Sequence, residues 1–102
     1  MTNRIHTLKT WPAPFQAILD GKKRHEIRVD DRGYAEGDVL HLVEWDPSVE
    51  AFAPMSASLR RTGDYTGREC NVRVTYLTPG GQWDLPSNLC VMSIERIDGR
   101  HD

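Results

Sequence analysis

Apolar and polar positions alternate along several short stretches of the chain, which is typical of β-strands with one buried face. The clearest stretch is residues 69–77 (ECNVRVTYL), whose alternation points four side chains inward: Cys70, Val72, Val74 and Tyr76. Residues 39–45 (VLHLVEW) are apolar on both faces, as expected for a central strand. Three further strands are predicted, over residues 4–11, 23–29 and 89–97.

One short helix is predicted between the first two strands. Pro14 suits the first helical position, where its missing N–H costs nothing. Phe15, Ile18 and Leu19 follow at helical spacing, and Gly21 supplies the C-terminal stop. We therefore expect a helix of about two turns with one buried face.

The rest of the chain predicts connections. Residues 46–68 contain prolines and glycines but few periodic apolar positions, so we expect a long loop there. A second loop covers residues 78–88, and residues 98–102 are expected to be a frayed tail. Helices do not alternate with strands, so the fold class is mostly β (α+β), a small barrel of about five to six strands. The length of 102 residues indicates one domain, 1–102.

Charge is unevenly distributed along the chain. The formal net charge is −2, which excludes a binder that relies on bulk positive charge. Residues 1–32 carry seven basic against four acidic side chains, a balance of +3, and residues 33–102 carry −5. This excess in the first third reflects either codon bias and chance or a basic face that binds anions.

Several kinds of protein are not expected. No run of about 18 apolar residues is present, and the N-terminus lacks the apolar stretch of a secretory signal, so we expect a cytoplasmic protein without membrane contact. Two cysteines, Cys70 and Cys90, make no disulfide framework, and no Cys or His pair has metal-ligand spacing. We expect no metal and no cofactor, and no nucleophile elbow or phosphate loop is present.

The most informative segment is DGKKRHEIRVDDRG, residues 20–33. Alternation puts His25, Ile27 and Val29 on one face of its strand, and places Glu26 and Arg28 together on the other. Two interpretations stay open. The charges either cross-pair on a solvated face, each pair contributing about 0–1 kcal/mol, or they line a polar pocket. In that pocket Arg would bind phosphate or carboxylate, and a carboxylate would accept from base or sugar donors.

Tryptophans at element junctions supply a second feature. Trp11 precedes the helix and Trp83 follows the Gly-Gly turn, so either indole could stack on a base. Trp45, at a strand end, is interpreted as a core residue.

The order of motifs resembles one known family. H-x-L-K-x-W (His6 to Trp11) precedes P-x-x-F-x-A-I-L-x-G-x-K (Pro12 to Lys23), and E-I-R-x-x-D-R starts at Glu26. G-D-x-L-x-L, E-W-D-P, Y-T-G-R and G-G-Q follow in that order. This arrangement resembles the ASCH superfamily of PUA-like domains, most closely a small bacterial and phage subfamily, over nearly the whole chain.

The resemblance implies a PUA-like barrel with the helix over one opening and a cleft beside it. In the superfamily that cleft is associated with RNA or nucleotides, and some relatives hydrolyse an acylated cytidine nucleoside or cleave RNA. The amidohydrolase branch has a catalytic Thr three residues after a Lys like Lys23, and here that place is Glu26. The chain therefore departs from that branch at a catalytic position.

We favour a binding module that takes RNA or a nucleotide-like small molecule in a cationic cleft, as a monomer or weak dimer. The expected ligand-binding residues are Lys9, Trp11, Lys23, Glu26, Arg28, Arg32 and Gln82. The alternative is a hydrolase of the ASCH type acting on RNA or a modified nucleoside, in which Glu26 activates water and Lys23 stabilises negative charge. A third hypothesis is a phage or prophage protein that sequesters a ligand or partner through the long loop.

Overall fold

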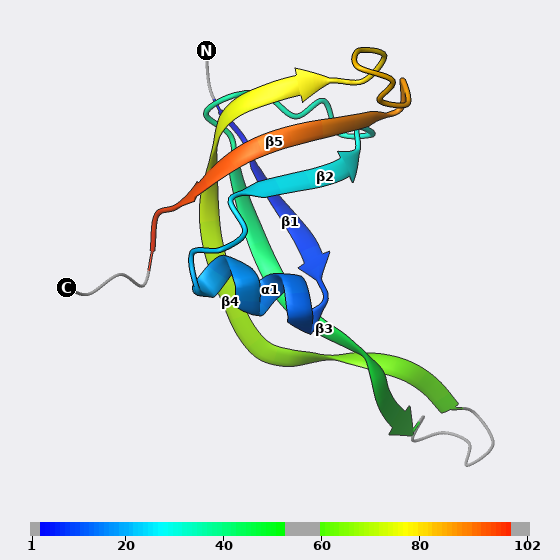
Figure 1. The fold of residues 1–102 in the computed structure, drawn as a ribbon. Helices are drawn as coiled ribbons and strands as arrows, with labels where there is room; N and C mark the ends of the chain where they lie inside the picture. The colour runs from blue at the N-terminus through cyan, green and yellow to red at the C-terminus, as the bar shows by residue number, and fades with distance from the viewer. Residues whose placement is uncertain (1–2, 53–59, 99–102) are drawn as a thin grey trace.

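The computed structural model describes residues 3–52 and 60–98. Within them lie five strands and one helix (Figure 1). In chain order these are β1 (Ile5–Thr10), α1 (Pro12–Leu19), β2 (His25–Val29), β3 (Val39–Phe52), β4 (Arg60–Pro79) and β5 (Leu89–Arg96). The fold is mostly β, with a single short helix between the first two strands, as predicted.

All five strands form one sheet in the order β1-β3-β4-β5-β2. β1 pairs in parallel with β3, and the other neighbours are antiparallel. The sheet curls into a half-barrel, and its edge strands β1 and β2 approach each other without a backbone ladder (Figure 1). Arginine side chains cross this gap: Arg28 Nη2 donates to the Lys9 carbonyl at 2.9 Å, and Arg32 Nη1 donates to that of Thr7 at 3.4 Å. We call this junction the seam.

The apolar core fills the concave side of the sheet. Inward-facing positions of the strands pack with Phe15 and Ile18 of α1, and all of them are buried: Leu8, Leu40, Leu42, Cys70, Val72, Val74, Cys90, Met92 and Ile94. Burial raises the pKa of the Cys70 thiol to about 11, so this thiol stays protonated and behaves as a small hydrophobe.

The helix begins two residues earlier than predicted. Trp11 is its N-cap and Pro12 takes the first helical position, because either proline of the Pro-Ala-Pro run fits the first turn. The predicted end is confirmed: Gly21 has a φ of 76° and donates its N–H to the Ile18 carbonyl at 3.0 Å.

The prediction of a loop over residues 46–68 is wrong. Residues 46–52 and 60–68 extend β3 and β4 as a hairpin that projects away from the half-barrel (Figure 1). The centre of the predicted loop, residues 53–59, lies outside the described residues. Strands that extend beyond the core need no apolar alternation, so the sequence pattern did not reveal them. Proline cannot donate a backbone hydrogen bond, and a register shift at Pro47 interrupts the ladder there, so none is required.

Two smaller predictions also fail. Tyr76 was expected to point inward, but a register shift between Val74 and Tyr76 turns it outward, leaving it 60% exposed. Asp98, placed in the frayed tail, accepts from the backbone N–H and the side-chain amide of Asn71 at 2.8 and 2.9 Å. Residues 99–102 of that tail lie outside the described part of the chain.

Candidate functional site

A hollow of about 360 Å³ opens beside α1, where the end of β1 meets the start of β2. Helix, turn and strand follow one another closely in the chain, so this short segment supplies most of the wall. Five of the predicted ligand-binding residues line this first hollow: Lys9, Trp11, Lys23, Glu26 and Arg28. His25 and Ile27 complete the β2 side.

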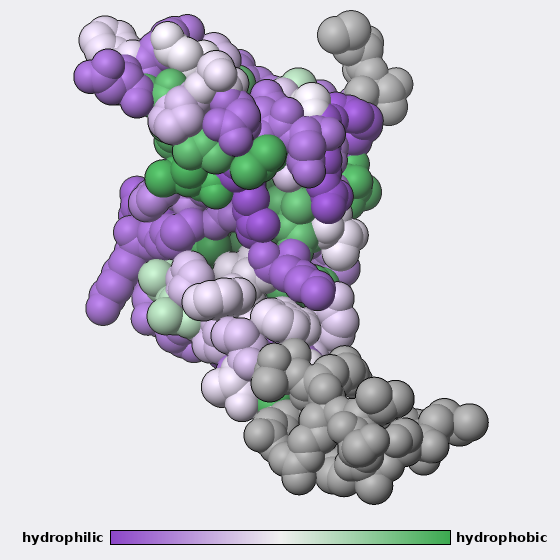
Figure 2. All heavy atoms as spheres, turned by 90° about the vertical axis from the view of Figure 1, so that its right-hand side faces the viewer, coloured by the Kyte–Doolittle hydropathy of each residue, from purple (hydrophilic) through white to green (hydrophobic). Residues whose placement is uncertain are grey.

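The orientation of β2 reverses what its hydropathy suggests. Glu26 is buried and 3% exposed, whereas Ile27 and Val29 are 53% and 51% exposed. The charges of this strand do cross-pair, as the first interpretation expected, but the solvated face that it expected is wrong for Glu26, which is buried. Figure 2 shows hydrophobic spheres between hydrophilic ones on the side of the molecule toward which β1 and β2 end.

Glu26 is held by two cations. Lys23 Nζ donates to its Oε1 and to the His25 carbonyl, and Arg28 Nε donates to its Oε2 at 2.9 Å. The side chains of Lys23 and Arg28 are 20% and 25% exposed, so each is fixed on the protein side and still reaches the hollow. We call these three residues the Glu26 cluster.

The balance of charge around the first hollow is positive. Lys9, Lys23 and Arg28 face one carboxylate, that of Glu26. Beside them Trp11 is 58% exposed, although it is fixed at its backbone as the N-cap of α1. The hollow thus offers an aromatic surface next to pre-positioned cations, a combination that suits an anionic ligand with a flat ring.

Lys9 also joins the hollow to the base of the hairpin. Its Nζ lies 4.6 Å from the centre of the Trp45 ring and 5.7 Å from that of Tyr65. Behind Trp45 stands Gly63, where a Cβ would come within 2.0 Å of the indole. Trp45 is only partly buried, and it supports Lys9 in addition to filling space.

A buried carboxylate that the sequence interpretation missed lies near the helix. Glu44 is 3% exposed and forms a bidentate ion pair with Arg68, in which Nε donates to Oε1 at 2.9 Å and Nη2 donates to Oε2 at 3.0 Å. Arg68 in turn donates to the Gln16 side chain of α1 at 3.1 Å. Hydrogen bonds from Arg68, and then Thr66, hold the pKa of Glu44 below its usual range despite burial. Both partners of this ion pair lie in motifs that the sequence analysis quoted, Glu44 in E-W-D-P and Arg68 in Y-T-G-R.

A third buried carboxylate closes the opposite end of the half-barrel. Asp38 accepts from the backbone N–H groups of Arg4 and Ala35, both at 3.1 Å, and lies 2.9 Å from His6 Nε2. The His6 ring packs edge-on against Tyr34, with centroids 4.7 Å apart. Burial opposes ionisation of Asp38, but these hydrogen bonds outweigh it and lower its pKa.

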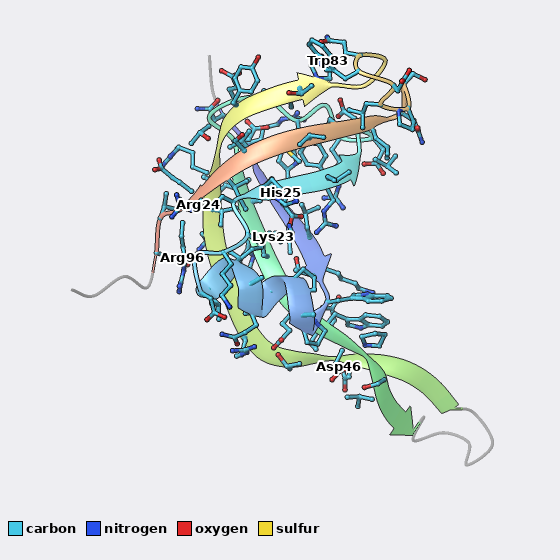
Figure 3. All side chains as sticks on the ribbon, in the orientation of Figure 1. Lys23, Arg24, His25, Asp46, Trp83 and Arg96 are labelled. Atoms are coloured by element: carbon cyan, nitrogen blue, oxygen red, sulfur yellow. The ribbon has the colours of Figure 1, made fainter. Side chains whose placement is uncertain are left out.

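The structure places Arg32 and Gln82 outside the first hollow. Arg32 lines a second hollow of about 390 Å³ farther along the seam, with Leu8 and Tyr34. Gln82 is exposed in the turn between β4 and β5, next to Trp83. That turn adjoins the Val29 end of β2, whereas Lys23 lies before the His25 end, and Figure 3 shows Trp83 and Lys23 far apart.

On the other side of Lys23 lies a third hollow of about 350 Å³. It is lined by the C-terminal end of α1 and by β5, with Arg24 and Arg96 at its edge (Figure 3). Among the described residues no group of three His, Cys, Asp or Glu side chains could hold a metal ion. In residues 3–52 and 60–98 no helix is long and apolar enough to cross a membrane.

Fold and hollow together define a small β-barrel domain with a cationic, tryptophan-edged site. The chain belongs to the family described as "Domain of unknown function (DUF3850)", which matches residues 5–94. It is 35% identical over 83 residues to the "Uncharacterized 12.9 kDa protein in GpA 3'region" of Escherichia phage P2. That match covers 81% of this chain and 62% of the phage protein, so the chain spans less than two thirds of its relative.

Proposed function

We propose that this domain binds RNA or a nucleotide in the first hollow. The observation that carries the proposal is the exposed Trp11 indole beside three cations, Lys9, Lys23 and Arg28. An indole can stack on any base, and base stacking contributes about 1–3 kcal/mol per base. The cations supply the contact to phosphate that a neutral aromatic ligand would not need.

The size and chemistry of the hollow support a ligand of this class. Its volume of about 360 Å³ is at the lower end of ordinary small-molecule sites, about 300–1,000 Å³. The resemblance to ASCH domains points to the same cleft beside the helix. The described hydrogen bonds of Arg28 use its Nε and Nη2 atoms, and they hold the guanidinium group in place in the lining of the hollow.

Binding is better supported than hydrolysis. A general base must accept a proton from water, yet Glu26 accepts from Lys23 at one oxygen and from Arg28 at the other. Lys23 is likewise engaged by Glu26 and by the His25 carbonyl. These contacts make Glu26 the anchor that orients two cations, in place of the base that the hydrolase hypothesis assigns to it.

Trp11→Ala tests the proposal, with Trp83→Ala as a matched control. Both indoles are exposed, at 58% and 88%, but only Trp11 lines the hollow. In titrations with adenosine monophosphate and short single-stranded RNA, Trp11→Ala should weaken binding about 5- to 150-fold, the loss of one stacked base. Trp83→Ala should bind like the unmodified protein. Equal weakening by both variants, or no binding by the unmodified protein, would reject the site.

Incubation with RNA and with an acylated cytidine nucleoside separates binding from hydrolysis. We expect binding without turnover. Product formation by the unmodified protein that disappears in Glu26→Gln would instead establish the hydrolase and overturn the binding-only proposal.

A further inference from the structure

We infer that the site takes two consecutive nucleotides of a single strand, laid along the seam from Trp11 to Arg32. The inference rests on the proposed function, since it extends the same site. Its basis is the position of the second hollow, which shares Ile27 and Arg28 with the first and therefore adjoins it. The hollows measure about 360 and 390 Å³, so neither is a minor annex of the other.

The second hollow has walls suited to a base and a cation suited to phosphate. Leu8, Val29 and the buried Tyr34 give it apolar surface. Its charged lining consists of two guanidinium groups, those of Arg28 and Arg32, and one carboxylate, that of Asp31. The Arg32 side chain is 46% exposed, and its contacts are long, at 3.4 Å to the Thr7 carbonyl and 4.0 Å to the Asp31 carboxylate. A guanidinium held so loosely can turn to a ligand at little cost.

Arg28 stands between the two hollows. Among the described residues, it is the only charged one that lines both hollows. A phosphate that links two nucleotides, one in each hollow, would lie beside this guanidinium. β2 has five residues and advances about 3.3 Å per residue, so it is about 17 Å long. The two hollows beside this strand are therefore close enough for two linked nucleotides to occupy both.

The seam favours a nucleic-acid strand over an added peptide strand. A peptide that extends a sheet needs free backbone groups at the edge. Here the Lys9 carbonyl already accepts from Arg28 at 2.9 Å. Across the same junction, Arg4 Nη2 donates to the carbonyls of Arg32 and Gly33. An occupant must therefore be recognised by side chains, and most of the charged ones that line the first hollow are cationic.

The test compares adenosine monophosphate, adenosine diphosphate and the 5′-phosphorylated dinucleotide pApA by titration calorimetry. The diphosphate adds charge without a second nucleoside. We expect pApA to bind at least tenfold more tightly than either mononucleotide. Arg32→Ala should remove most of that gain and leave monophosphate binding within twofold of the unmodified protein.

Arg73→Ala is the matched control, because Arg73 is exposed and, like Arg32, has a 3.4 Å contact to a carbonyl, that of Gly37. It removes the same charge away from the seam and should keep the full gain. If pApA binds no better than the monophosphate, or if Arg73→Ala loses as much as Arg32→Ala, the inference fails while the proposed function stands. Equal binding of an acidic hexapeptide would also overturn it. Binding of none of these ligands would overturn both proposals.

Discussion

Asp38 and Glu26 are buried carboxylates at opposite ends of one small barrel, and they are surrounded by different kinds of partner. Asp38 accepts two backbone N–H groups and contacts a histidine that is itself packed against Tyr34. Glu26 is held by Lys23 and Arg28, whose long side chains remain partly exposed at a hollow. The first arrangement fixes the chain, while the second fixes cations where a ligand can reach them.

This difference separates structural from ligand-binding use of the same chemical group. Backbone donors cannot turn toward a ligand, so the hydrogen bonds of Asp38 are all made to groups of the protein itself and leave no donor for a ligand. Lysine and arginine carry several donors each, and a carboxylate that engages some of them leaves others for an anion. The comparison makes a simple claim, that changes at Asp38 alter stability alone, whereas changes at Glu26 alter stability and binding.

The largest effect is expected from Asp38→Ala. Removal of this carboxylate leaves buried His6 and two backbone N–H groups without their acceptor, which should lower the free energy of unfolding by about 3–5 kcal/mol. Urea unfolding measures this loss. The folded fraction should bind adenosine monophosphate with unchanged affinity, and a large change in that affinity would contradict the comparison.

An intermediate effect is expected from Glu44→Gln, and it depends on pH. The pKa of Glu44 is lowered in the folded protein, so its carboxylate contributes stability above the unfolded value of about 4 and loses it as pH falls through the folded value. At pH 7 the variant should be about 1.5–3 kcal/mol less stable, the contribution of hydrogen bonds to a charged group. Unfolding curves of the variant and the unmodified protein should converge as the pH falls below 4. A constant difference would show that Glu44 acts through shape alone.

The smallest loss of stability should come from Glu26→Gln, because both of its partners can turn toward solvent. We expect a cost of about 1–2 kcal/mol in urea unfolding. Affinity for inorganic phosphate should rise, by about tenfold at low salt, since the only carboxylate of the first hollow among the described residues becomes neutral. Unchanged phosphate binding would show that the Glu26 cluster is a structural unit like Asp38.

The sequence predicted the parts of the molecule that depend on local order. Apolar alternation located the strands, and Gly21 located the end of the helix. Lys23 and Glu26 meet because a turn and a strand start connect them directly. The face that β2 turns inward was not predictable, because alternation defines two faces without saying which is buried. Ion pairing reverses the expected choice by allowing Glu26 to enter the interior.

Longer-range features escaped prediction for a different reason. Glu44 and Arg68 are 24 positions apart and meet only because β3 and β4 pair as a hairpin that was taken for a loop. The placement of Arg32 in a second hollow depends on how far the sheet curls, which no local pattern records. Tyr76 was misplaced by a single register shift.

The seam differs from every other strand junction of the described sheet in how it is held. Elsewhere, neighbouring strands are joined by ladders of backbone hydrogen bonds, but the described contacts across the seam come from the side chains of Arg4, Arg28 and Arg32. These side-chain contacts can break without disrupting the backbone hydrogen bonds of either strand, so the half-barrel can open along the seam. A nucleic-acid strand bound at the seam would contact both β1 and β2 and hold them together. Occupancy would then be visible as slower amide hydrogen exchange in β1 and β2 ahead of any other strand.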